Sequence, residues 1–193
     1  MNRTTRPLLL LALGAIIFAS CKKDKDETPS TPAPVNENEV ITTMIITFQD
    51  TTGDTPDKVW KFRDADGDGG NAPVITVDTL LTNTVYHGSL LLLNETEDPA
   101  DTSSNEVLEE NTIHQFFYQV TGANIAFHYA DTDDNGYPIG LETLVNTGAL
   151  STGQTKVTLI HECQKTQPGV ADGDITNAGG STDIEVTFPV AVH

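Results

Sequence analysis

Oxygen-bearing side chains alternate along one acidic stretch of the sequence, in a spacing that suits a hard cation. The stretch matches the pattern D-x-[DN]-x-[DN]-G-x5-E in full, beginning at Asp131 and ending at Glu142. In a loop of this type alternate oxygens converge on one ion, a glycine allows the tight turn, and the last carboxylate binds with both oxygens. The pattern therefore predicts a candidate Ca²⁺ site whose ligands are Asp131, Asp133, Asn135, the carbonyl of Tyr137, and Glu142.

A second acidic stretch has only the first half of this pattern. Ile75 stands where the closing carboxylate would be. Each stretch directly follows a segment in which aromatic and polar residues alternate, so the two look like a weak internal repeat. The second stretch is therefore a weaker candidate, with Asp64, Asp66 and Asp68 as its ligands.

Both acidic stretches can also be interpreted as turns that bind no metal. Their flanking segments predict strands rather than the two helices of an EF-hand, and Pro138 has no backbone N–H to offer at the eighth loop position. Asp, Asn and Gly are also the residues that β-turns favour. An acidic hairpin that binds no cation is the alternative.

Sequence patterns of known enzyme types are missing. There is no G-x-S-x-G elbow, P-loop, dinucleotide fingerprint or C-x-x-C pair. His161 and Glu162 lack the second histidine of a zincin helix, and we expect His114 at a strand edge rather than as a ligand. His87 and His128 should face solvent. We therefore expect no catalysis; an unfamiliar enzyme that holds a catalytic metal in the acidic loops is a further alternative.

The acidic composition limits the partners. The 193 residues carry a formal net charge of −18. Such a charge repels phosphate backbones, which argues against nucleic-acid binding, and suits a cation, a basic partner or an inert surface. Of the two cysteines, Cys163 has no intramolecular partner if Cys21 carries lipid, and we expect it to be small and partly buried.

The N-terminal residues predict export and lipidation. Arg3 and Arg6 precede an apolar run that ends at Phe18, which is shorter than a membrane-spanning helix. The small residues before Cys21 resemble the lipobox of bacterial lipoproteins, in which this thiol is diacylated. We therefore expect residues 1–20 to be a lipoprotein signal peptide. An ordinary secretory signal or an N-terminal anchor is the alternative.

The residues that follow Cys21 predict a tether. Residues 21–39 are charged and then rich in Pro, Ser and Thr, a composition that cannot bury enough apolar surface to fold. Lys22 stands where an Asp would favour retention in the inner membrane, and the charged cluster resembles signals that send lipoproteins of the Bacteroidota to the outer-membrane surface. We expect the outer membrane, with the periplasmic face as the alternative to the cell surface.

From residue 40 onward, apolar side chains recur at every second position in short segments separated by turn residues. This period of two predicts one all-β domain over residues 40–193, an antiparallel β-sandwich of the immunoglobulin or fibronectin III type with roughly eight or nine strands. Ser103 and Glu106 predict a capped short helix. The expected strands include 85–93, 116–120, 125–129, 141–145, 157–161 and 184–192, and the expected buried residues are Phe48, Trp60, Tyr86, Phe127, Leu159 and Phe188.

Three residues add a detail to this fold. Leu80, Thr84 and Tyr86 have the spacing L-x-x-x-T-x-Y, which is similar to the tyrosine corner of fibronectin III-like domains. There the tyrosine hydroxyl bonds back to the preceding turn. A tyrosine that merely opens a strand is the alternative.

Four segments together suggest a family. They resemble a set of small uncharacterised lipoproteins of the Bacteroidota that are often labelled "type 1 periplasmic binding fold superfamily". That label implies a larger, two-lobed α/β fold, whereas the alternation here implies strands. The resemblance implies no catalytic residues. It rests on residues 62–70, 114–117, 138–141 and 173–180.

These observations converge on one functional expectation. The chain should be an outer-membrane-anchored lipoprotein whose β-sandwich is a binding or interaction module, with Ca²⁺ as the candidate stabilising cofactor. Its partner would be an envelope protein, a glycan or a peptide, and the membrane itself through the lipid. A structural envelope or assembly component without a small ligand is the alternative.

Overall fold

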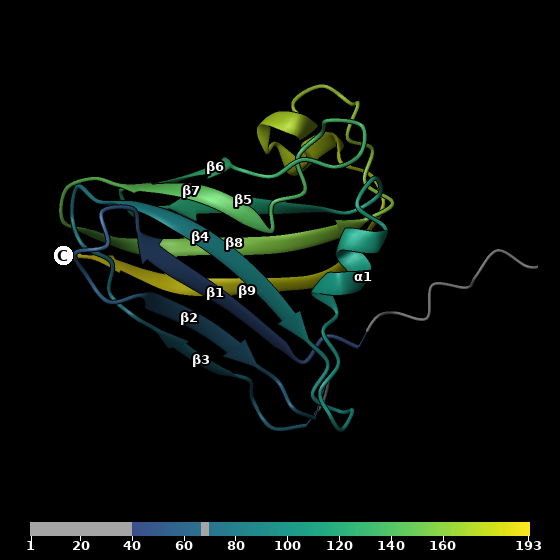
Figure 1. The fold of residues 1–193 in the computed structure, drawn as a ribbon, viewed down its shortest axis with the longest axis horizontal. Coiled ribbons are helices and arrows are strands. Elements are labelled where there is room, and N and C mark those ends of the chain that lie inside the picture. The colour runs from purple at the N-terminus through teal and green to yellow at the C-terminus, as the bar shows by residue number, and fades with distance from the viewer. Residues whose placement is uncertain (1–39, 67–69) are drawn as a thin grey trace, which may run out of the picture. The chain divides into compact units, whose positions relative to one another are not determined.

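The computed structural model describes residues 40–66 and 70–193. In this part of the chain nine strands form two antiparallel sheets, with one short α-helix (Figure 1). The expected all-β, sandwich-like fold is therefore confirmed, and the α/β fold that the family label implies is not found. The predicted signal peptide, Cys21, the tether and Asp68 lie outside the described residues.

The larger sheet has six strands in the order β3-β2-β1-β4-β7-β6. Its strands are rich in β-branched and aromatic residues that alternate with polar ones, as a sheet with one buried face requires. The edge strand β3 was not predicted, because it is only four residues long and mostly exposed. The strands are β1 (Thr43–Asp50), β2 (Lys58–Arg63), β3 (Val74–Val77), β4 (Val85–Leu93), β6 (Ile125–Tyr129) and β7 (Glu142–Thr147).

The smaller sheet has three strands in the order β5-β8-β9: β5 (Gln115–Thr121), β8 (Ser151–His161) and β9 (Ser181–Val192). Strands β5 and β6 are consecutive in sequence but belong to different sheets, so the turn between them is a crossover and not a hairpin. The same holds for β7 and β8. As a result β5 and β6 are edge strands of opposite sheets, and the functional candidate described below lies where they come together.

Apolar side chains from both sheets form one core. Five of the six residues that we expected inside are fully buried: Phe48, Trp60, Tyr86, Leu159 and Phe188. Full burial of one such side chain stabilises the fold by about 1.5–3 kcal/mol. Phe127 is only half-buried because it lies on the edge strand β6.

A smaller apolar cluster lies between the three-stranded sheet and the segment that follows β8. Phe117 and Ile160 come from the sheet, whereas Cys163 and Val170 come from this segment. Burial raises the pKa of the Cys163 thiol to about 11. The segment also contains two 3₁₀ turns, η1 (Val170–Asp172) and η2 (Ile175–Asn177), which bring its chain toward β6.

The short helix forms where it was expected, but its capping box is wrong. Helix α1 spans Ser104–Glu109 and contributes Val107 to the core. Ser103 has helical backbone angles and its side chain makes no cap hydrogen bond, because a capping serine needs an extended backbone. The hydroxyl of Ser104 instead accepts a hydrogen bond from the N–H of Leu92 at 3.3 Å.

The tyrosine corner is present. The Tyr86 hydroxyl accepts a hydrogen bond from the N–H of Leu81, in the preceding turn, at 2.9 Å. Tyr86 is fully buried, so this bond satisfies a polar atom that water cannot reach. It fixes the connection that enters β4.

Candidate functional site

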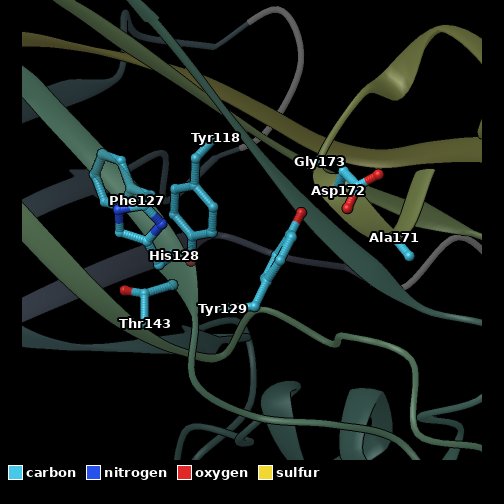
Figure 2. A pocket seen from close by; sticks show the side chains of 8 residues that line it. All are labelled: Tyr118, Phe127, His128, Tyr129, Thr143, Ala171, Asp172 and Gly173. Atoms are coloured by element: carbon cyan, nitrogen blue, oxygen red, sulfur yellow. The ribbon is translucent and has the colours of Figure 1, made fainter. Parts of the chain in front are cut away.

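A cavity of about 350 Å³ opens where the edge strands of the two sheets meet. One wall comes from β5, β6 and β7, and the other from the end of η1 and the glycine after it. Figure 2 shows the Tyr129 ring between Tyr118 of the first wall and Asp172 of the second. The residues that line the cavity are Tyr118, Phe127, His128, Tyr129, Thr143, Ala171, Asp172 and Gly173.

The aromatic wall is built across the gap between the sheets. Tyr118 of β5 stacks on Phe127 of β6, with ring centroids 4.5 Å apart and ring planes 10° apart. The Tyr118 hydroxyl donates a hydrogen bond to the carbonyl of Gly140 at 2.6 Å. Burial raises the pKa of Tyr118 well above its ordinary value, so the phenol stays neutral. The stacked pair thus forms a rigid, uncharged surface.

Tyr129 is held just as firmly. Its hydroxyl donates to the carbonyl of Phe116 at 2.7 Å and accepts from the side-chain amide of Gln115 at 3.1 Å. Burial raises its pKa to about 12. Gly173 approaches this ring closely: a Cβ there would lie 3.5 Å from the hydroxyl, and its φ of +92° favours glycine.

The rim of the cavity is polar. His128 and Asp172 are exposed, and Thr143 is buried beneath them. Both phenols are neutral and already hydrogen-bonded, so they provide binding surface rather than acid or base groups. Such a combination of aromatic walls with a few polar groups is typical of a binding site for a small polar ligand.

The acidic loop that the sequence marks as a Ca²⁺ candidate lies next to this cavity, between β6 and β7. Asp131 accepts hydrogen bonds from the backbone N–H groups of Gly140, Leu141 and Glu142, at 2.7, 2.8 and 3.0 Å. These bonds use both oxygens of its carboxylate. Asp131 therefore closes the loop onto the start of β7.

Asp133 is bound by the chain in a similar way, together with a lysine that sequence reasoning missed. One oxygen accepts from the N–H groups of Asn135 and Tyr137, and the other accepts from the ammonium of Lys165 at 3.0 Å. The carbonyl of Tyr137 accepts from the N–H of Asp133. Burial raises the pKa of Asp133, but the hydrogen bonds from Lys165 and the backbone outweigh this effect and hold it below its ordinary value.

Lys165 is buried, with its side chain 3% exposed. Its ammonium donates three hydrogen bonds, to Asp133 and to the carbonyls of Asn111 and Pro138, at 3.0, 2.6 and 2.9 Å. Burial lowers the pKa of Lys165, and Asp133 opposes this. Three acceptors match the three N–H bonds of the charged form. In this structure a lysine thus supplies the positive charge that the loop pattern assigns to a metal ion.

The remaining candidate ligands are spread out. Glu142 lies at the start of β7, 3.2 Å from the ring nitrogen of His87, and Asn135 is exposed. Burial raises the pKa of Glu142, and His87 opposes this. Ca²⁺ binding at Asp131, Asp133, Asn135, Tyr137 and Glu142 stays a prediction, and it requires these contacts to rearrange.

The second acidic stretch, which contains Asp64 and Asp66, follows β2, as its aromatic flank predicted. Asp66 accepts hydrogen bonds from the backbone and side chain of Asn71, both at 2.8 Å, which lower the pKa of its carboxyl. Asp64 donates its N–H to the carbonyl of Thr42. The structure therefore does not bring Asp64 and Asp66 together with the loop around Asp131.

A fourth region was missed by sequence reasoning. His114 was expected at a strand edge, but it is fully buried just before β5 and stacks on His161 at the end of β8. Glu110 and Asp183 lie beside this pair. Residues far apart in sequence form this cluster, and so no spacing pattern could reveal it.

Within residues 40–66 and 70–193, no helix is long and apolar enough to span a membrane. His87 and His128 are exposed, as expected. Comparison of the chain with protein-family models, with curated proteins and with solved structures finds no match in any of the three.

Proposed function

We propose that this chain is an outer-membrane lipoprotein, anchored through Cys21, whose β-sandwich is a non-catalytic module that binds a glycan or peptide. The lipobox and the tether support the anchor. The cavity between the two edge strands supports the binding module, and we take it as the ligand site. The expected envelope location would bring the cavity close to glycans and peptides of the cell wall and surface.

The observation that carries the binding proposal is the aromatic wall of this cavity. Tyr118, Phe127 and Tyr129 are held in place before any ligand arrives, by stacking and by hydrogen bonds to carbonyls. A preformed wall saves the free energy of ordering side chains on binding. A cavity of about 350 Å³ suits one sugar ring or one peptide side chain.

Asp172 is the polar group of the rim that we expect to orient the ligand. A hydrogen bond from a ligand hydroxyl or amine to a carboxylate contributes about 1.5–3 kcal/mol. Asp172→Ala should therefore weaken binding about tenfold or more. Asp54→Ala is the matched control, because Asp54 is an exposed aspartate in the turn after β1.

The test is to recover the full chain from solubilised outer membrane and to identify retained small molecules by mass spectrometry. The ligand so found is then titrated against wild type, Asp172→Ala and Asp54→Ala. Weaker binding in Asp172→Ala alone supports the proposal. Equal affinity in all three proteins, or no retained glycan or peptide, contradicts it.

Anchoring is tested separately. Cys21→Ala should move the protein from the detergent phase to the aqueous phase, because two or three acyl chains hold a protein in a membrane and none remains in this variant. Mass spectrometry that shows an unmodified Cys21 in the wild type would contradict this part of the proposal without affecting the binding part.

A structural role in the envelope is the second candidate. It is favoured by exposed apolar side chains on the outer face of the six-stranded sheet, where Val85 and Leu91 on β4 and Leu144 on β7 are about two-fifths exposed. Under this alternative a stoichiometric envelope protein should be recovered with the wild type and lost in Leu144→Lys, yet retained in Asp172→Ala.

A further inference from the structure

Four side chains of the metal-binding type meet at the end of the sandwich next to α1 (Figure 1). Glu110 follows the helix, His114 precedes β5, and His161 ends β8; one nitrogen or oxygen from each lies within 4.8 Å of the others. Asp183 of β9 faces His114. The segment between α1 and β5 thus contributes two side chains, and the strands β8 and β9 contribute one each.

The buried half of this cluster consists of His114 and Asp183, whose side chains are 0% and 4% exposed. Nδ1 of His114 lies 3.2 Å from the carbonyl oxygen of Glu110. Because a carbonyl can only accept, this contact places the ring proton on Nδ1. In the neutral ring Nε2 then carries the lone pair, as it does in metal-binding histidines whose other nitrogen donates to a carbonyl.

Nε2 of His114 lies 3.6 Å from Oδ2 of Asp183. Among the residues that the structure describes, none donates a hydrogen bond to this carboxylate oxygen. A nitrogen lone pair and a carboxylate oxygen that face each other in a buried place repel each other. A positive charge between them removes this repulsion. A second proton on the ring or a metal cation can supply it.

A β-bulge aims Asp183 at this position. Leu159 pairs with Ile184, but Ile160 pairs with Thr182, so Asp183 is the extra residue on β9. Beyond the bulge the odd-numbered Glu185 is exposed. The bulge interrupts the alternation of exposed and buried side chains along β9, so that the Asp183 carboxylate points into the protein. Bulges are known to re-aim side chains in this way near functional sites.

The other half of the cluster is accessible to solvent. Side chains of His161 and Glu110 are 12% and 53% exposed, and their Nε2 and Oε2 atoms lie 4.0 Å apart. The rings of His161 and His114 stack at 4.6 Å, with planes 17° apart, so their in-plane lone pairs run nearly parallel. A shared ion therefore requires the His161 ring to turn, and its position at the surface allows this.

We propose that Glu110, His114, His161 and Asp183 bind one transition-metal ion of the Zn²⁺ class. Imidazole nitrogens select Zn²⁺, Cu²⁺, Ni²⁺ or Fe²⁺ over Ca²⁺ and Mg²⁺. Tetrahedral Zn²⁺ with bonds of about 2.0–2.1 Å places its ligand atoms about 3.3 Å apart. The present separations are 3.6 Å between His114 and Asp183, 4.0 Å between His161 and Glu110, and up to 4.8 Å within the group Glu110, His114 and His161, so the ligand atoms need to approach one another by up to about 1.5 Å.

The test uses the metal-stripped full chain in detergent. Zn²⁺ is titrated by calorimetry, and Co²⁺ is titrated with its visible absorption as the readout of tetrahedral coordination. We expect one ion per chain, and a weakening of about tenfold or more in His161→Ala and in Asp183→Asn. His193→Ala removes an exposed histidine elsewhere and should leave the Kd unchanged.

Absence of one-to-one Zn²⁺ binding would overturn the proposal, as would an unchanged Kd in His161→Ala or an equal loss in His193→Ala. An unchanged Kd in Asp183→Asn would overturn the assignment of Asp183 as a ligand. Thermal melting of each metal-free variant shows that it is folded. His161→Ala is the safer variant in this respect, because this side chain is partly exposed.

Discussion

The loop around Asp133 and the cluster around His114 both bring buried carboxylates next to a nitrogen base, and they differ in how completely the carboxylates are bonded. In the loop, all four carboxylate oxygens of Asp131 and Asp133 accept hydrogen bonds from the backbone or from Lys165. In the cluster, Oδ2 of Asp183 lies 3.6 Å from Nε2 of His114, and no residue in the described part of the chain donates a hydrogen bond to it.

This difference indicates which of the two regions would be stabilised by binding a ligand. A buried network in which every polar atom is bonded stabilises one conformation and gains little from a further ligand. A buried carboxylate with incomplete bonding costs free energy, and a cation that completes it removes that cost. The part of the loop around Asp131 and Asp133 therefore suits a structural role, whereas the cluster suits a binding role.

Removal of Lys165 should have the largest effect. Lys165→Met leaves Asp133 as a buried charge without its partner, and breaking such a pair costs about 3–5 kcal/mol. We expect this decrease in the free energy of unfolding by urea denaturation. The double variant Lys165→Met/Asp133→Asn should recover part of it; a loss in the double variant equal to the sum of the single losses would show that the two groups are not coupled.

Calcium should distinguish Lys165→Met from the wild type. Any Ca²⁺ that binds Asp133 must replace the Lys165 ammonium, so millimolar Ca²⁺ should raise the Tm of the variant more than that of the wild type. A hundredfold excess over the Kd corresponds to about 2.7 kcal/mol. Melting in EGTA and in Ca²⁺ measures this difference, with Glu142→Gln to locate the site. Equal responses in both proteins would mean that Lys165 does not occupy the cation position.

Asp183→Asn should have a smaller effect on the metal-free protein. The substitution removes a buried charge whose bonding is incomplete, and the introduced amide can donate to Nε2 of His114, so we expect the free energy of unfolding to stay unchanged or to rise by about 1 kcal/mol. Urea denaturation in the presence of a chelator measures it. A loss as large as that of Lys165→Met would mean that the cluster is a closed ion pair like the loop, and the contrast between the two regions would then disappear.

His87→Ala should have the smallest effect. His87 and Glu142 form a pair with both side chains more than two-fifths exposed, and such pairs contribute about 0–1 kcal/mol. The thermal unfolding curve should hardly move at pH 7. A loss comparable to that of Lys165→Met would show that the exposed end of the acidic loop matters as much as its buried part.

The period of two predicted the sandwich well because side-chain alternation is a local property of each strand. β4 matches its predicted bounds, and β9 begins three residues earlier than expected. β8 begins at Ser151 rather than at residue 157, because its first half is polar and exposed and carries no apolar signal. The assignment of consecutive strands to opposite sheets depends on long-range packing, which no local pattern contains.

The candidate sites were less predictable. Asp131 and Asp133 could be singled out because their spacing is regular, but Lys165 lies 32 residues away from Asp133 and reaches it only after the chain has folded back. Asp183 likewise depends on a bulge in the register of β9. Tyr118 and Phe127 become the walls of a cavity only because their strands end up on opposite sheets.

The burial of Cys163 has a consequence for the export that we propose for this protein. Its thiol is 6% exposed and has a pKa of about 11, so at pH 7 only about one molecule in ten thousand carries the thiolate. Disulfide exchange requires that thiolate, together with access for the attacked sulfur. In a compartment where enzymes oxidise accessible thiols to disulfides, Cys163 should therefore stay reduced. It should not form an intermolecular disulfide.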